Sequence, residues 1–242
     1  RDNKHSIIFY PNTFTDKIKA YVFRRKRIVP DLFVVPCKKF TPFYLTAFAL
    51  SPSQVIELPY ARSVVQKQQI KENTERKSLK VLYAPTLRSP LQLITLNEFI
   101  LNLNECLVQL GLELEVAFHP ANVDHFHNNV VVTHNGVSEL DFKSYEFCIT
   151  DYSSIIWDWD MLNIDFLVIN LSDWKFHELT REMYFSLSDC LNFSLSSNDE
   201  LLRWISSWKN GQKRYCKLKE GWGYELLSEP RFYFEEYKRL LT

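Results

Sequence analysis

From about Leu79 onward, short apolar runs rich in β-branched and aromatic residues alternate with longer segments whose apolar residues recur at helical spacing. This alternation is typical of βαβ units, so it predicts an α/β fold with a parallel sheet and flanking helices. The predicted strands are Leu79–Ala84, Leu112–Phe118, Val130–Thr133, Phe147–Thr150 and Phe166–Ile169. The predicted helices are Leu91–Leu110, Ser153–Leu162, a helix opened by the capping box Ser197–Glu200 with Leu201, Ile205 and Trp208 on one face, and a last helix from Ser228.

The first 78 residues have a different pattern. Leu32–Val35 and Val55–Leu58 are predicted strands on either side of a short helix around Tyr44–Leu50. Val64–Lys77 is polar and charged, which predicts a linker or an exposed helix. We therefore expect residues 1–78 to be a lead-in and linker that includes the end of an N-terminal domain, and residues 79–242 to form the sheet domain. The chain begins at Arg1 without an initiator methionine, so we expect it to be part of a longer protein.

Composition excludes several classes of function. Only 5 of the 242 residues are glycine, and they form neither a G-x-x-x-x-G-K-[ST] loop nor a G-x-G-x-x-G turn. This excludes Walker-type NTPases and the standard dinucleotide fingerprint. The 29 basic residues balance the 29 acidic ones, so no overall charge favours nucleic acid as a partner.

The cysteines and histidines give no sign of a disulfide framework or a metal site. The 5 cysteines are odd in number and widely spaced, which predicts reduced thiols in the cytoplasm. The spacing of His119, His125, His127 and His134 matches no standard ligand pair, so no metal and no cofactor are predicted. The basic run Phe23–Arg27 suits either a solvated face or linker, or peripheral contact with an anionic membrane surface.

Polar residues follow three of the predicted strands at the point where each strand ends. Thr86 and Arg88 follow the first strand, His119 follows the second, and Ser153 and Ser154 follow the fourth. Ligands of open parallel sheets bind at the carboxyl ends of the strands, so we expect these side chains to converge there. The two serines would stand at a helix N-terminus, which favours an anion. Asp158, one turn later, could accept hydrogen bonds from ribose hydroxyls.

Each of these residues also has an ordinary structural interpretation. Asp151 or Ser153 could simply cap the helix, His119 could be a packed histidine at a strand end, and Arg88 could be a surface arginine. Their expected convergence on one edge of the sheet favours the binding role. No G-x-S-x-G motif or other nucleophile motif indicates hydrolase chemistry.

The ordered motifs resemble the CDP-glycerol glycerophosphotransferase family, which includes teichoic-acid primases and polymerases and related capsule enzymes. The resemblance covers roughly residues 28–170, and its most specific part is the run Ile149–Ser154. Val81–Arg88, His119-Pro120, Asp158 and the upstream segments Val29–Pro36 and Leu58–Arg62 also contribute to it. Where the family usually has a Gly-x-Pro-Arg-like turn, this chain has Tyr60-Ala61-Arg62.

The resemblance implies a GT-B architecture of two Rossmann-like domains, of which residues 79–242 would be the C-terminal, donor-binding one. It implies that Thr86, Arg88, His119, Ser153 and Ser154 bind the donor diphosphate and that Asp158 contacts the nucleoside. The implied reaction transfers a polyol phosphate from a CDP-linked donor to a lipid-linked or polymeric acceptor, with CMP leaving. It would take place in the cytoplasm, peripherally at the inner face of the membrane.

One hallmark of the family, a His-Gly pair that looks like the site of the general base, has no match here. His134-Asn135-Gly136 differs from it in sequence and position. The catalytic base is therefore unknown and expected in an N-terminal domain beyond this chain, and the isolated chain is expected to bind donor but transfer little. Two other interpretations stay open: a GT-B glycosyltransferase or epimerase that uses a UDP sugar, and a non-catalytic nucleotide-binding domain of a capsule assembly complex.

Overall fold

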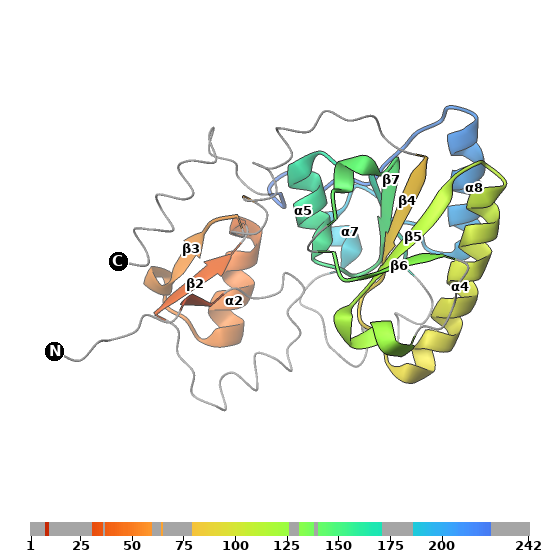
Figure 1. Cartoon of the computed structure of the whole chain (residues 1–242). Helices are drawn as coiled ribbons and strands as arrows, with labels where there is room; N and C mark the ends of the chain where they lie inside the picture. The colour runs from red at the N-terminus through yellow and green to blue at the C-terminus, as the bar shows by residue number, and fades with distance from the viewer. Residues whose placement is uncertain are drawn as a thin grey trace. The chain divides into compact units, whose positions relative to one another are not determined.

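The computed structural model describes residues 8–9, 31–35, 37–59, 64, 79–125, 131–137, 140–170 and 186–223 (Figure 1). The chain divides into two compact units. The smaller unit consists of Arg1–Asn73, Glu178–Cys190 and Leu218–Thr242, and the larger consists of Thr74–His177 and Leu191–Lys217. In the part of the chain that the structure describes, no helix has the length and apolar character needed to cross a membrane.

The larger unit is built on a five-stranded sheet in which every strand pair is parallel. The strands are β4 (Lys80–Ala84), β5 (Glu113–Phe118), β6 (Val132–Asn135), β7 (Phe147–Thr150) and β8 (Phe166–Val168). Their order is β6-β5-β4-β7-β8, so the chain builds outward on one side of β4 and then returns to the other side. This reversal creates a topological switch point between β4 and β7, the place where open α/β sheets bind ligands.

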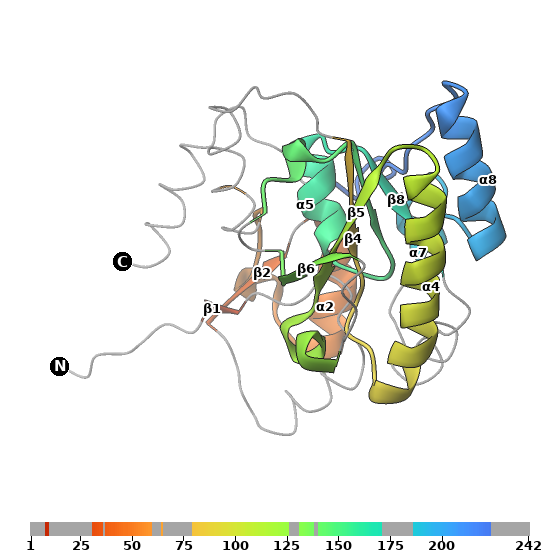
Figure 2. The ribbon, with the colours of Figure 1, turned by 45° about the vertical axis from the view of Figure 1, so that its right-hand side comes forward.

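Helices cover both faces of this sheet. Helices α4 (Pro90–Val108) and α8 (Asn198–Lys209) lie on one face, and α5 (Ile155–Leu162) lies on the other (Figures 1 and 2). On the first face, the ring of Tyr83 packs against Phe99 of α4, and Phe147 packs against Trp204 of α8. On the second, Trp159 of α5 packs against Phe166. Each face of the sheet therefore has its own apolar layer, as the predicted βαβ pattern requires.

The helix boundaries have local causes. A capping box formed by Ser89 and Gln92 opens α4, which also has a proline at its first position. After α4, Gly111 adopts a left-handed φ of 73°, which glycine accepts without steric cost, and the chain turns into β5. Ser197 caps α8 by accepting a hydrogen bond from the Glu200 N–H. The three helices predicted for the described part of the larger unit begin within two residues of their observed starts.

Most predicted elements are confirmed, with small corrections at their ends. The predicted strand Phe147–Thr150 matches β7 residue for residue, whereas α5 begins at Ile155 rather than Ser153. On α8 the fully packed tryptophan is Trp204, and Trp208, expected on the buried face, is only half-buried. Two short 3₁₀ helices, η3 (Pro120–His125) and η4 (Phe142–Ser144), were not predicted. The last predicted helix, from Ser228, lies outside the described residues.

The smaller unit contains a three-stranded parallel sheet in the order β1-β2-β3. Its elements are β1 (Ile8–Phe9), β2 (Leu32–Val35), η1 (Lys38–Phe40), α2 (Thr41–Phe48), η2 (Pro52–Gln54), β3 (Val55–Glu57) and α7 (Leu187–Cys190). The predicted strand–helix–strand pattern is confirmed by β2, α2 and β3, while β1 was not predicted. The rings of Phe33, Phe40, Tyr44 and Phe48 pack together, and Trp222 contacts Phe40 edge-on.

Candidate functional site

The candidate site lies where β4, β5 and β7 end. Because β4 pairs with both β5 and β7, the three loops that follow these strands start at one edge of the sheet. The loop after β4 carries Thr86 and Arg88, η3 follows His119 after β5, and Asp151–Ser154 connects β7 to α5. The structure thus brings the predicted loops together, as the sequence indicated.

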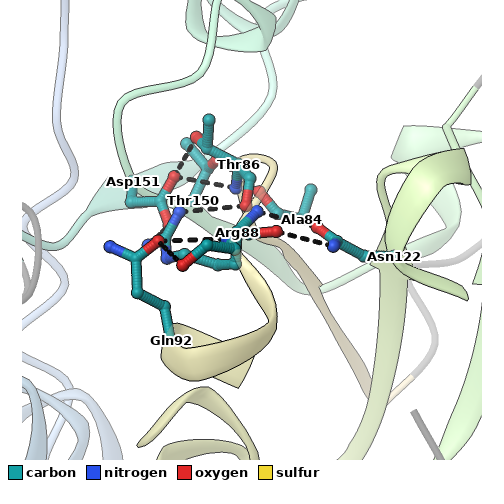
Figure 3. A network of polar contacts seen from close by, with 8 residues as sticks. Ala84, Thr86, Arg88, Gln92, Asn122, Thr150 and Asp151 are labelled. Atoms are coloured by element: carbon teal, nitrogen blue, oxygen red, sulfur yellow. Dashed lines mark hydrogen bonds and ion pairs between the residues drawn. The ribbon is translucent and has the colours of Figure 1, made fainter. Parts of the chain in front are cut away.

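A buried ion pair joins the loop after β4 to the loop after β7 (Figure 3). The Arg88 Nη2 atom lies 2.6 Å from Asp151 Oδ2, and both side chains are 0% exposed. Arg88 Nη1 also donates to the Thr86 carbonyl over 2.9 Å. Buried charges persist only when they are paired and hydrogen-bonded, so each member of this pair depends on the other. Arg88 is therefore not the surface arginine of the ordinary interpretation.

Asp151 also holds Thr86 in place. Its Oδ1 atom accepts the Thr86 N–H at 2.9 Å and the Thr86 hydroxyl. Next to it, the Thr150 hydroxyl donates to the Ala84 carbonyl over 2.5 Å, which fastens the last residue of β7 to the last residue of β4 (Figure 3). From the sequence alone, Asp151 is a candidate cap of the helix that follows β7. In the structure its carboxylate instead binds the loop after β4.

The third loop is attached by Asn122, a residue of η3 that the sequence did not single out. Its Oδ1 accepts the Arg88 N–H and its Nδ2 donates to the Arg88 carbonyl, both over 2.8 Å (Figure 3). The Asn122 N–H in turn donates to the His119 carbonyl over 2.7 Å. The loops after β4 and β5 therefore have a fixed spacing at the candidate site.

His119 is exposed at the end of β5, so it is not a packed histidine. Its Nδ1 accepts the Ala121 N–H over 3.2 Å. An acceptor nitrogen carries no proton, so in the neutral ring the proton is on Nε2. Among the described residues Nε2 has no hydrogen-bond partner, which leaves it able to donate to a ligand.

Ser153 and Ser154 stand directly before α5, and both are half-buried. The Ser153 hydroxyl accepts the Ile155 N–H over a long 3.4 Å, so the capping interpretation applies to it weakly. Ser154 occupies the N-cap position, but its side chain makes no capping hydrogen bond. The N–H groups of Ile156 and Trp157 already donate to the carbonyls of Ser153 and Ser154. The Ser154 hydroxyl, at the positive end of the α5 dipole, can therefore donate to an anion.

Asp158, the predicted nucleoside contact, lies in the first turn of α5 and is only 4% exposed. Its burial places it among the apolar residues of the helix, such as Ile156 and Trp157, rather than at an open surface. Contact with a nucleoside stays a prediction for this residue.

A second polar cluster lies on β5, on the α5 face of the same sheet. Glu115 accepts hydrogen bonds from Lys80 at 2.6 Å, Tyr145 at 2.6 Å and His134 at 2.8 Å. Burial raises the pKa of Glu115, but the hydrogen bonds from Lys80, Tyr145 and His134 outweigh burial and leave its pKa below the ordinary value. Within the described ranges, no group of His, Cys, Asp and Glu side chains has the arrangement of a metal site.

Comparison with protein families decides what kind of protein this is. A sequence model described as CDP-glycerol:poly(glycerophosphate) glycerophosphotransferase matches residues 10–220. The chain belongs to this family. It is thus a transferase of the glycerophosphotransferase type, as the ordered motifs predicted. A search of curated proteins found no match.

Solved structures agree with the fold of this glycerophosphotransferase. A histidine-to-asparagine variant of the wall teichoic acid polymerase TagF has a TM-score of 0.62 at 17% identity, covering 100% of this chain and 70% of that chain. The same variant soaked with CDPG for 30 minutes has a TM-score of 0.63 at 17% identity, covering 100% and 69%. The UDP-GlcNAc 2-epimerase of Methanocaldococcus jannaschii has a TM-score of 0.52 at 10% identity, covering 87% and 61%. These likenesses show a shared GT-B-like α/β fold.

Proposed function

We propose that the larger unit binds CDP-glycerol at the carboxyl edge of its sheet, with the diphosphate at the N-terminus of α5. The observation that carries this proposal is the Ser154 hydroxyl, which stands at the N-cap without a capping bond, at the positive end of the α5 dipole. A solved TagF structure soaked with CDPG is one of the similar structures, which supports this choice of donor.

The groups that can donate hydrogen bonds to a diphosphate in this site are mostly neutral. The Arg88–Asp151 pair is buried and has no net charge, so it contributes little long-range attraction for a phosphate. The hydroxyl groups of Ser153 and Ser154 and the Nε2–H of His119 would supply the hydrogen bonds instead. Thr86 and Arg88 would shape the same diphosphate site, because Asp151 and Asn122 hold the loop that carries them in a fixed position. Asp158 would contact the nucleoside side of the donor.

The reaction follows from this placement. The acceptor hydroxyl oxygen bonds to the β-phosphorus of the donor, and the bond from that phosphorus to the bridging oxygen breaks. The electron pair of that bond leaves with CMP, and the hydroxyl proton passes to a general base, which we expect in an N-terminal domain. Protein groups that already point their hydrogen-bond donors at the two phosphates would stabilise the negative charge that grows on the transferred and leaving groups. The acceptor is a lipid-linked or polymeric poly(glycerophosphate), reached peripherally at the inner face of the membrane.

The test is calorimetric titration of CDP-glycerol into the wild type and the Ser154→Ala variant. Loss of one phosphate hydrogen bond should weaken binding by roughly 1.5–3 kcal/mol while the fold stays intact. Ser197→Ala is the matched control, because that serine caps α8 through the Glu200 N–H and so should lose stability but no donor affinity. Unchanged affinity in folded Ser154→Ala would reject the phosphate role of this serine.

A further inference from the structure

The side chain of Asn122 makes an unusual pair of contacts. It is 4% exposed, and both halves of its amide are used on the backbone of one residue 34 positions earlier in the chain. The amide oxygen accepts the Arg88 N–H and the amide nitrogen donates to the Arg88 carbonyl. The side chain thus pairs with the loop after β4 as a neighbouring strand would (Figure 3).

Only an asparagine satisfies both groups at this length. An aspartate has no donor for the Arg88 carbonyl, and an apolar residue would leave a buried N–H and a buried carbonyl unpaired. The sequence of the loop after β4 does not matter to these bonds, because they reach the backbone. Position 122 therefore needs an amide side chain because it must join two loops by hydrogen bonds, and not because of its packing.

The contacts of Asn122 continue to His119. The Asn122 N–H donates to the His119 carbonyl, and Ala121 between them donates its N–H to His119 Nδ1. The first bond closes a tight turn, and the second orients the imidazole ring so that Nε2 is the donor nitrogen. A continuous path of hydrogen bonds thus runs from the Arg88 backbone through Asn122 to the exposed histidine.

We propose that Asn122 is a positioning residue for donor binding: it fixes His119 at the distance from the loop after β4 that the donor phosphates require. This inference rests on the proposed function, because it needs His119 to bind the donor. Asn122 itself touches no ligand. Its effect should therefore pass through His119 and should disappear when the imidazole is removed.

A double-mutant cycle tests this coupling. CDP-glycerol affinity is measured by calorimetry for the wild type, Asn122→Ala, His119→Ala and the double variant. In the wild-type background Asn122→Ala should weaken binding about tenfold or more, since small misplacements of a binding group are costly. In the His119→Ala background the same change should weaken it less than about threefold. Equal effects in the two backgrounds would overturn the proposal, because a general structural role does not depend on His119.

The matched control is Asn104→Ala. Asn104 is also a buried asparagine of the larger unit, but it lies in the last two turns of α4, far along the helix from its start at the β4 loop. It should lose stability without changing donor affinity in either background. If Asn122→Ala does not fold, Asn122→Asp keeps the size and the acceptor and takes its place in the cycle.

A measurement without ligand separates the proposed role of Asn122 from the proposed binding of CDP-glycerol. In the wild type, ¹⁵N chemical shifts of the His119 ring should report a proton on Nε2, and Asn122→Ala should mix the tautomers. If the wild type binds no CDP-glycerol, the proposed function and this inference both fail. If it binds but the cycle is additive and the tautomer is unchanged, only the role of Asn122 fails.

Discussion

Two buried carboxylates of the larger unit show how one sheet can carry polar groups for different purposes. Asp151, at the carboxyl edge, pairs with an arginine, and both side chains are 0% exposed. Glu115, within β5, is 6% exposed, but its partners Lys80 and His134 are 40% and 29% exposed. The Asp151 carboxylate and its partner are both enclosed by the protein, whereas the partners of the Glu115 carboxylate are partly exposed to solvent.

The two clusters differ in whether their side chains can replace a contact within the protein by a contact with water. Lys80 and His134 can replace a contact with Glu115 by a contact with water, so their cluster tolerates change and responds to pH. Arg88 and Asp151 have no such alternative, because a buried charge without its partner is strongly disfavoured. The Arg88–Asp151 pair therefore fixes the relative position of the loops after β4 and β7, which is what a binding site between those loops requires.

The largest expected effect comes from breaking the buried pair. Arg88→Met leaves the Asp151 carboxylate buried and uncompensated, so it should lower the free energy of unfolding by about 3–5 kcal/mol. Denaturant unfolding of both proteins measures this. Combining Arg88→Met with Asp151→Leu should recover part of the loss, because neither charge then stays unpaired.

The control for this prediction is Lys213→Ala. Its ion pair with Glu146 joins a lysine that is 46% exposed to a glutamate that is 16% exposed. An exposed pair contributes only about 0–1 kcal/mol. If Arg88→Met cost no more than this control, the buried pair would not fix the loops.

A smaller and pH-dependent effect is expected at Glu115. Glu115→Gln removes the charge that Lys80 and His134 bind, and should lower the free energy of unfolding by about 1–3 kcal/mol near neutral pH. The folded pKa of Glu115 lies below its ordinary value of 4.5, so the unfolded chain takes up a proton first as the pH falls. The stabilisation is therefore present above pH 4.5 and is lost as the pH drops through the folded pKa.

The measurement is denaturant unfolding of the wild type and Glu115→Gln at a series of pH values from neutral to acidic. The difference between the two proteins should be constant near neutral pH and should shrink once the pH is below 4.5. A difference that stays the same down to the acid limit would mean that the Glu115 charge does not stabilise the fold.

Much of the fold could be predicted from the sequence because its signals are local. The apolar run Phe147–Thr150 and the capping box Ser197–Glu200 define their elements without knowledge of the rest of the chain. The placement of the loops that carry Thr86, His119 and Ser154 at one edge of the sheet followed from the rule that parallel strands end at one edge. These predictions need only the order of the strands and helices along the chain.

The rest depends on partners that are distant in sequence. Asn122 binds a backbone rather than a side chain, so no residue type elsewhere indicates its partner. Asp151 looks like a helix cap until β7 is placed beside β4, which brings Arg88 within reach. Phe147 and Tyr215 contact both Trp204 and Trp208 of α8, so the spacing along the helix alone does not show which of the two tryptophans is the more buried.

The central claim is that the loops held by Asp151 and Asn122 form a site for a CDP-linked donor. The most direct measurement is a calorimetric titration of the 242-residue chain with CDP-glycerol and, in parallel, with a UDP sugar. The account predicts saturable one-to-one binding of CDP-glycerol, competed by CDP, with affinity at least about tenfold above that of the UDP sugar, a difference of roughly 1.4 kcal/mol. Equal or tighter binding of the UDP sugar, or no binding of CDP-glycerol by the folded chain, would contradict it.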